Sequence, residues 1–134
     1  MPRGLRAGSA SIPLSSYFRG TAPPKPLCAQ VLCFDDALEI VAISAEPSVE
    51  WETEIAEAVP ESPQCLRLYA GYLGSLCGYL PTKAQIPEGG YEVEGFQSLF
   101  GFSGQFDAGE IRPAVLSCVR RAFEAARSNP GRAG

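Results

Sequence analysis

Three short apolar runs separated by turn residues predict three β-strands. They cover residues 28–34 (CAQVLCF), 37–43 (ALEIVAI) and 65–70 (CLRLYA). Apolar runs of this length, bounded by Pro, Asp and Gly, are typical of strands in a sheet core. Because only Asp35-Asp36 separates the first two runs, we expect these two strands to form an antiparallel hairpin.

A helical period lies between the second and third predicted strands. The spacing places four apolar side chains on one face of a helix, namely Trp51, Ile55, Ala58 and Val59. Glutamates occupy the opposite face, and Ser48 is the predicted N-cap. A strand, a helix and a strand in this order predict a βαβ unit, whose two strands run parallel.

A second helical stripe occupies the end of the chain, after Asp107 as a candidate cap. Its apolar positions are Ile111, Val115, Cys118, Val119, Ala122 and Ala126. This spacing predicts a helix that packs its apolar face on the core.

The predicted fold class is therefore α/β, with a small mixed sheet, a hairpin, one βαβ crossover and a C-terminal helix. Residues 27–128 would form this unit. Residues 1–26 are rich in Gly, Ser and Pro without a strand or helix period, so we expect a disordered or loosely attached segment. Residues 129–134 are expected to form a flexible tail.

The βαβ geometry brings two distant segments to one edge of the sheet. Glu46 follows the strand 37–43, and the loop 71–95 follows the strand 65–70. Because parallel strands end at the same edge, where open α/β sheets collect their sites, Glu46 and Tyr79 are expected to meet there. From the residues alone, two simpler interpretations stay open. Glu46 could be a glutamate favoured by the helix dipole, and Tyr79 a half-buried tyrosine bonded to its loop.

Composition narrows the chemistry. The 134 residues contain no histidine, which excludes a Ser-His-Asp triad, a Cys-His pair or a histidine-based zinc site built within this sequence alone. The net charge is −4, and the sequence lacks the clustered basic residues that are typical of proteins that bind nucleic acids. No apolar run approaches a transmembrane segment, and no signal peptide is apparent, so the sequence predicts a cytoplasmic protein with reduced thiols.

Three motifs together resemble the late part of the neutral ceramidase-like hydrolases. They are Glu46-Pro47 between a strand and a helix, Gly78-Tyr79-Leu80-Pro81-Thr82, and Gly89-Gly90-Tyr91-Glu92. The resemblance covers roughly residues 27–127. It implies that the chain is an incomplete piece of a larger α/β catalytic domain.

The resemblance implies a zinc-dependent amidase that hydrolyses the N-acyl bond of ceramide-like lipids, an activity of sphingolipid metabolism. The family's zinc is held by two histidines, a glutamate and a tyrosine, and a water acts as the nucleophile. Glu46 and Tyr79 match the glutamate and the tyrosine. Thr82, Tyr91 and Glu92 match the surrounding loop and are candidates for its support.

The histidines and the catalytic serine of the family have no match in this sequence, so no catalytic residue is assigned. We expect the chain alone to bind zinc weakly and to be inactive as an enzyme. A separately encoded N-terminal portion could complete it, or the chain could self-associate through exposed sheet edges. The alternatives are a non-catalytic α/β interaction domain and the remnant of a truncated gene.

Overall fold

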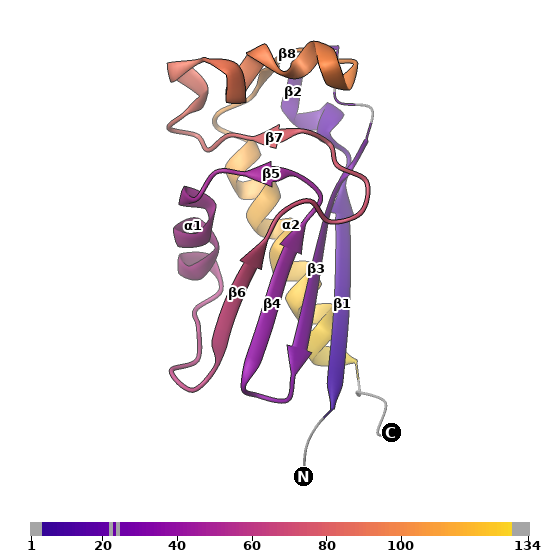
Figure 1. Cartoon of the computed structure of the whole chain (residues 1–134), viewed down its shortest axis with the longest axis vertical. Helices are drawn as coiled ribbons and strands as arrows, with labels where there is room; N and C mark the ends of the chain where they lie inside the picture. Colours follow the sequence, from indigo (N-terminus) through magenta and orange to yellow (C-terminus); the bar gives the residue numbers. More distant parts are fainter. Residues whose placement is uncertain (1–3, 22, 24, 130–134) are drawn as a thin grey trace.

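A four-stranded mixed sheet forms the centre of the computed structural model, which describes residues 4–21, 23 and 25–129 (Figure 1). The strand order is β1-β3-β4-β6. β1 is antiparallel to β3, β3 is antiparallel to β4, and β4 is parallel to β6. The bounds are Leu5–Ile12 for β1, Leu27–Phe34 for β3, Leu38–Ile43 for β4 and Leu66–Ala70 for β6.

The predicted hairpin and crossover are both present. β3 and β4 differ from the predicted strands by a single residue at one end each, and their turn places Asp35 in a left-handed conformation with φ of 53°. Helix α1 (Glu50–Ala58) connects β4 to the parallel strand β6, which confirms the βαβ unit. Trp51 and Ile55 of α1 are buried, as the helical spacing indicated.

The prediction of a loosely attached segment over residues 1–26 is wrong for most of that segment. β1 pairs with β3 along its whole length, and β2 (Phe18–Thr21) pairs with β8 (Ser103–Phe106). Small residues make this burial possible, because a Cβ on Gly8 would lie 2.2 Å from the backbone nitrogen of Ala126. Residues 1–3, 22 and 24 lie outside the described residues.

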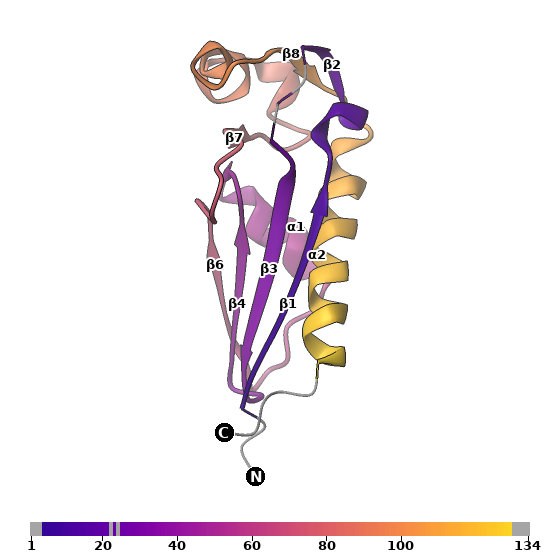
Figure 2. The same cartoon turned by 90° about the vertical axis from the view of Figure 1, so that its right-hand side faces the viewer.

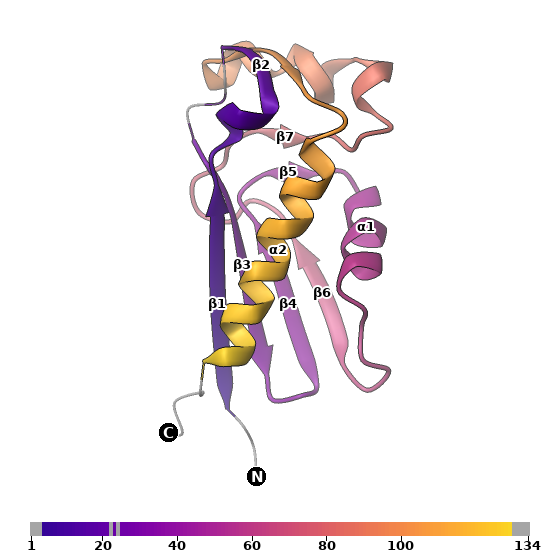
Figure 3. The same ribbon diagram turned by 180° about the vertical axis from the view of Figure 1, so that it is seen from behind.

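Helix α2 (Ile111–Ser128) packs on one face of the sheet, chiefly over β1 and β3 (Figure 3). The six predicted stripe positions are all buried, and Leu116 and Phe123 are buried as well. The carboxylate of Asp107 accepts hydrogen bonds from the backbone nitrogens of Gly109 and Glu110, so it caps the turn that precedes the helix. Of the predicted tail, only Asn129 is described.

The remaining segments lie beyond one end of the main sheet (Figure 1). They include a parallel pair of short strands, β5 (Glu46–Pro47) with β7 (Tyr79–Leu80). They also include the antiparallel pair β2 with β8. Four short helical turns complete this part, at Leu14–Tyr17, Ile86–Glu88, Tyr91–Gly95 and Gln97–Phe100. Edge-to-face contacts among Phe18, Phe96, Phe102 and Phe106 pack it internally.

No helix in the described part of the chain is both long enough and apolar enough to cross a bilayer.

Candidate functional site

Glu46 and Tyr79 lie directly opposite each other, in the parallel pair β5–β7. The backbone nitrogen of Glu46 donates to the carbonyl oxygen of Gly78 at 2.8 Å. The loop between β6 and β7 is held against the end of β4 by backbone hydrogen bonds, including Tyr72 to Ala45 at 2.9 Å. The prediction that Glu46 and Tyr79 meet at this sheet edge is therefore confirmed.

The position of the tyrosine depends on its neighbours in the chain. Gly78 has a φ of 114°, and a Cβ there would lie 2.5 Å from the ring of Phe96, so glycine is required both by conformation and by space. On the other side, the indole nitrogen of Trp51 donates to the carbonyl oxygen of Leu80 at 2.9 Å. Helix α1 thereby fixes the strand that carries Tyr79.

An acidic cavity of about 480 Å³ opens beside this pair. Its carboxylates come from β5, α1 and the loop after β7, namely Glu46, Glu50, Glu88 and Glu92. Tyr79, Ser48 and Gln85 also line it, and no lysine or arginine among the described residues does. Carboxylates gathered along one cavity make its electrostatic potential negative, which favours the binding of cations.

Two phenols face the Glu46 carboxylate. A hydrogen bond to Glu46 raises the pKa of Tyr72 to about 12. Loss of hydration, followed by the charge of Glu46 and the proximity of Tyr91, raises the pKa of Tyr79 as well. Both phenols are therefore protonated near neutral pH and can donate to the carboxylate.

Tyr72 was not among the predicted site residues. It adopts a left-handed conformation with φ of 59°, which is uncommon for a tyrosine, and its side chain is 60% exposed. Its place just after β6, at the same sheet edge as Tyr79, is the sequence signal that could have identified it.

The three predicted loop-support residues occupy different places. Thr82 is buried outside the cavity lining, and its carbonyl oxygen accepts hydrogen bonds from Gln85 and Ile86 in the next turn. Tyr91 is exposed, and its ring lies edge-on to Tyr79 with a centroid distance of 5.8 Å. Glu92 lines the cavity.

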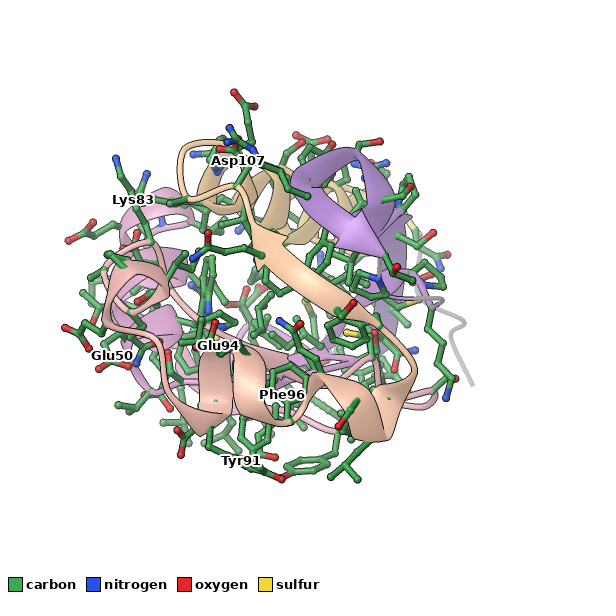
Figure 4. The ribbon with its side chains drawn as sticks, turned by 90° about the horizontal axis from the view of Figure 1, so that it is seen from above. Glu50, Lys83, Tyr91, Glu94, Phe96 and Asp107 are labelled. Carbon is green, nitrogen blue, oxygen red and sulfur yellow. The ribbon has the colours of Figure 1, made fainter. Side chains whose placement is uncertain are left out.

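Figure 4 looks down on this end of the molecule, with Tyr91 and Glu50 at the periphery and Phe96 further in. Phe96 is fully buried and contacts the ring of Tyr79 at a centroid distance of 5.0 Å. The ring of Phe96 therefore packs against the ring of Tyr79, while the Tyr79 hydroxyl remains near Glu46.

The donor set fits only part of a zinc site. Glu46 offers a carboxylate oxygen, and Tyr79 and Tyr72 offer phenolic oxygens. Structural and catalytic zinc sites usually take three or four nitrogen, sulfur or carboxylate ligands. In the described ranges 4–21, 23 and 25–129, no three His, Cys, Asp or Glu side chains gather to hold a metal ion. The described residues therefore do not form a complete site.

Comparisons with known proteins leave the family of this chain open. No protein-family model matches the sequence, and no curated protein matches it. A solved structure titled "Ceramidase complexed with C2" aligns with 76% of this chain at a TM-score of 0.48 and 16% sequence identity. The alignment covers 16% of that protein, so the present chain spans about a sixth of its length. Likeness at this level carries no information about activity.

Proposed function

We propose that this chain contributes a glutamate–tyrosine pair to the zinc site of an N-acyl amide hydrolase similar to the neutral ceramidases. The observation that carries the proposal is the register of β5 and β7, which sets Glu46 opposite Tyr79 beside an acidic cavity. These two residues are the ones that match the family's ligands in the motifs Glu46-Pro47 and Gly78-Tyr79-Leu80-Pro81-Thr82.

The chemistry of the pair supports metal ligation. A carboxylate is a hard anionic ligand, and a nearby cation lowers the pKa of a phenol so that its oxygen can bind as phenolate. Zinc bound there would polarise an amide carbonyl and activate a water molecule. In this chain, Glu46 and Tyr79 would be ligands of the metal ion. Tyr72 would donate a hydrogen bond that positions the Glu46 carboxylate.

An apolar cavity next to the pair supports a lipid-like substrate. It has a volume of about 300 Å³ and shares Glu46 and Ser48 with the acidic cavity. Its lining includes the exposed side chains of Val49 and Tyr72, above the buried residues Ile43, Trp51 and Ile55. An acyl chain would cover the exposed apolar surface of Val49 and Tyr72 while its amide group lay near Glu46.

The remaining ligands must come from another polypeptide segment, because this sequence contains no histidine. We therefore expect no amide hydrolysis by the 134-residue chain alone. Activity would appear only where a segment that carries two histidines and the serine completes the site.

The test is a complementation assay. The chain would be mixed with the upstream portion of a neutral ceramidase that lacks its own C-terminal part, and turnover of a fluorogenic ceramide would be measured. The proposal expects activity in the mixture only, with large losses for Glu46→Ala and Tyr79→Phe. Tyr17→Phe, which removes a phenol away from the cavity, is the matched control. Turnover by the chain alone that survives both site substitutions would refute the proposal.

A further inference from the structure

The two edges of the main sheet differ in how far their outward backbone groups are already bonded. β1 and β6 are the edge strands, and α2 runs beside β1 in Figure 2. At the β1 edge, Arg121 donates to the carbonyl oxygen of Ser11 at 3.1 Å, and Asn129 donates to that of Ala7 at 3.3 Å. Carbonyl groups that already accept a hydrogen bond are poor partners for an added strand. Side chains of the same chain therefore protect the β1 edge.

The β6 edge has no such protection among the described residues. The backbone nitrogen of Leu66 donates to the carbonyl oxygen of Ala37 at 2.9 Å, so alternate residues of β6 face β4 and the residues between them face outward. Those outward residues are Arg67 and Tyr69. The side chain of Arg67 is 1% exposed while the whole residue is 6% exposed, so most of its exposed area belongs to the main chain. β6 therefore presents two N–H donors and two carbonyl acceptors that the described residues leave unpaired.

The two sides of this edge differ in chemistry. On the face opposite α2, the side chains of Leu66 and Leu68 are 61% and 46% exposed. On the side of α1, the Tyr69 hydroxyl donates to the Glu61 carboxylate at 2.8 Å, and Glu52 lines the cavity of about 300 Å³ that Tyr69 also borders. No lysine or arginine among the described residues lines that cavity. The β6 edge is therefore apolar on one side and acidic on the other.

We propose that the β6 edge binds an extended polypeptide segment, of about the length of β6, in which apolar and basic side chains alternate. The unpaired backbone groups select a β-strand, because an extended main chain supplies donors and acceptors at the spacing of Arg67 and Tyr69. Successive side chains of the added strand would point to opposite faces, so one set would contact the two leucines and the other would meet the two glutamates. Lysine and arginine suit the second set, since opposite charges on neighbouring strands are favourable.

The same features disfavour other occupants. An acyl chain would cover the leucines but leave the donors and acceptors of β6 unpaired, and a helix bonds its own main-chain groups internally. A second copy that paired through its own β6 would bring Glu52 and Glu61 of both copies to the same side of the joined sheet. It would offer no basic side chain from β6 in return, because Arg67 is bonded to Glu39 at 2.8 Å. Like charges on neighbouring strands are unfavourable.

A capped heptapeptide that alternates lysine and valine is the probe, added to the isotope-labelled full chain. Hydrogen exchange followed by NMR should slow about fivefold or more at the amides of Arg67 and Tyr69 when the peptide is in excess, because both amides would then be hydrogen-bonded. The amides of Ala7 and Ser11, at the protected β1 edge, are the internal control and should exchange at an unchanged rate.

Two control peptides separate backbone pairing from charge. A peptide that is N-methylated at every amide keeps its lysines but has no N–H donors, and it should bind at least about tenfold more weakly. A peptide with glutamate in place of lysine keeps the donors and reverses the charge, and it should also bind more weakly. Equal binding of the N-methylated peptide would show that charge alone holds the probe, and it would overturn the proposal.

A matched pair of variants tests the edge itself, with affinity measured by fluorescence anisotropy of the labelled lysine–valine peptide. Tyr69→Pro removes one outward donor, and Tyr69→Ala removes the same ring but keeps the donor. Proline is tolerated where an edge N–H faces solvent, and circular dichroism would verify the fold of both variants. Tyr69→Pro should bind the peptide at least about fivefold more weakly than Tyr69→Ala does. If Tyr69→Pro does not fold, the N-methylated peptide decides the same question on the wild-type chain.

The acidic side is tested by the double variant Glu52→Gln with Glu61→Gln, which should weaken peptide binding about two- to fivefold. Unchanged exchange at the Arg67 and Tyr69 amides in excess peptide would overturn the proposal. So would a dimer of the chain alone, seen by sedimentation velocity, that protects the same two amides, since the edge would then bind a second copy. These outcomes are independent of the zinc proposal, because the β6 edge does not include its two ligands.

Discussion

Glu46 is the register partner of Tyr79, although 33 positions separate the two residues in the sequence. The pairing follows from the βαβ unit, because β4 and β6 end at the same edge and their following segments form β5 and β7. The hydrogen bond from Trp51 to Leu80 and the close approach of Phe96 to Gly78 then hold the residues on either side of Tyr79 in place at that edge. A local geometry of this kind can be tested residue by residue.

Gly78→Ala should destabilise the fold and displace Tyr79. The new methyl group would combine an unfavourable φ with a clash against the buried ring of Phe96. The free energy of unfolding should fall by about 3 kcal/mol or more, measured by urea denaturation. Gly90→Ala is the control, since Gly90 has a similar φ of 103° but open space around its Cβ position. It should cost about 1–2 kcal/mol, and equal losses for the two variants would contradict the packing argument.

The phenol of Tyr72 should ionise at unusually high pH. Its pKa of about 12 results from the hydrogen bond to Glu46, so Glu46→Gln should bring that pKa down towards the ordinary value near 10. Absorbance titration of the phenolates, with Tyr72→Phe to assign the step, would measure it. If Glu46→Gln left the pKa of Tyr72 unchanged, the hydrogen bond between Tyr72 and Glu46 would be contradicted.

The same contact links stability to pH. The folded chain holds the Tyr72 proton more tightly than the unfolded chain does, because the folded pKa is the higher one. The resulting stabilisation is complete below about pH 10 and is lost as the pH rises towards 12. Urea denaturation at pH 9 and pH 11 should show a smaller loss for Tyr72→Phe than for the wild type. An equal loss in both chains would show that other groups govern the alkaline transition.

The five free cysteines should differ sharply in reactivity. Burial raises the pKa of the Cys77 thiol to about 11, and burial also raises the pKa of the Cys33 and Cys118 thiols. Cys28 and Cys65 are partly exposed, although loss of hydration and the charge of Glu39 also raise the pKa of the Cys65 thiol. Because the reagent must reach the sulfur, iodoacetamide at pH 8 should modify these two accessible cysteines before the three buried ones. Mass spectrometry of the native chain would show the order, and early modification of Cys77 would contradict the described packing.

The sequence predicted the elements whose signal is local. The strands at 28–34, 37–43 and 65–70 carry continuous apolar runs, and α1 and α2 carry helical stripes, so periodicity alone located them. The meeting of Glu46 and Tyr79 was also predictable, because it follows from strand direction rather than from side-chain detail.

β1 was missed because its signal is not local. Its sequence, LRAGSASI, contains small residues that are unremarkable by themselves. They form a strand because β3 supplies the hydrogen-bond partners and because α2 approaches so closely that only Gly8 fits beneath it. The contact of Tyr72 with Glu46 was missed for a similar reason, since it depends on a left-handed residue within an irregular loop.

The most direct test of the proposed half-site is a zinc titration followed by NMR of the tyrosine ring signals. The chain would carry Cys28→Ser and Cys65→Ser, which remove the two partly exposed thiols as competing ligands. We expect weak binding that shifts the Tyr79 and Tyr72 signals selectively, and we expect Glu46→Ala to abolish those shifts while Glu124→Ala, on the exposed side of α2, preserves them. Tight stoichiometric binding elsewhere, or Tyr79 shifts that persist in Glu46→Ala, would contradict the assignment of Glu46 and Tyr79 as partner ligands.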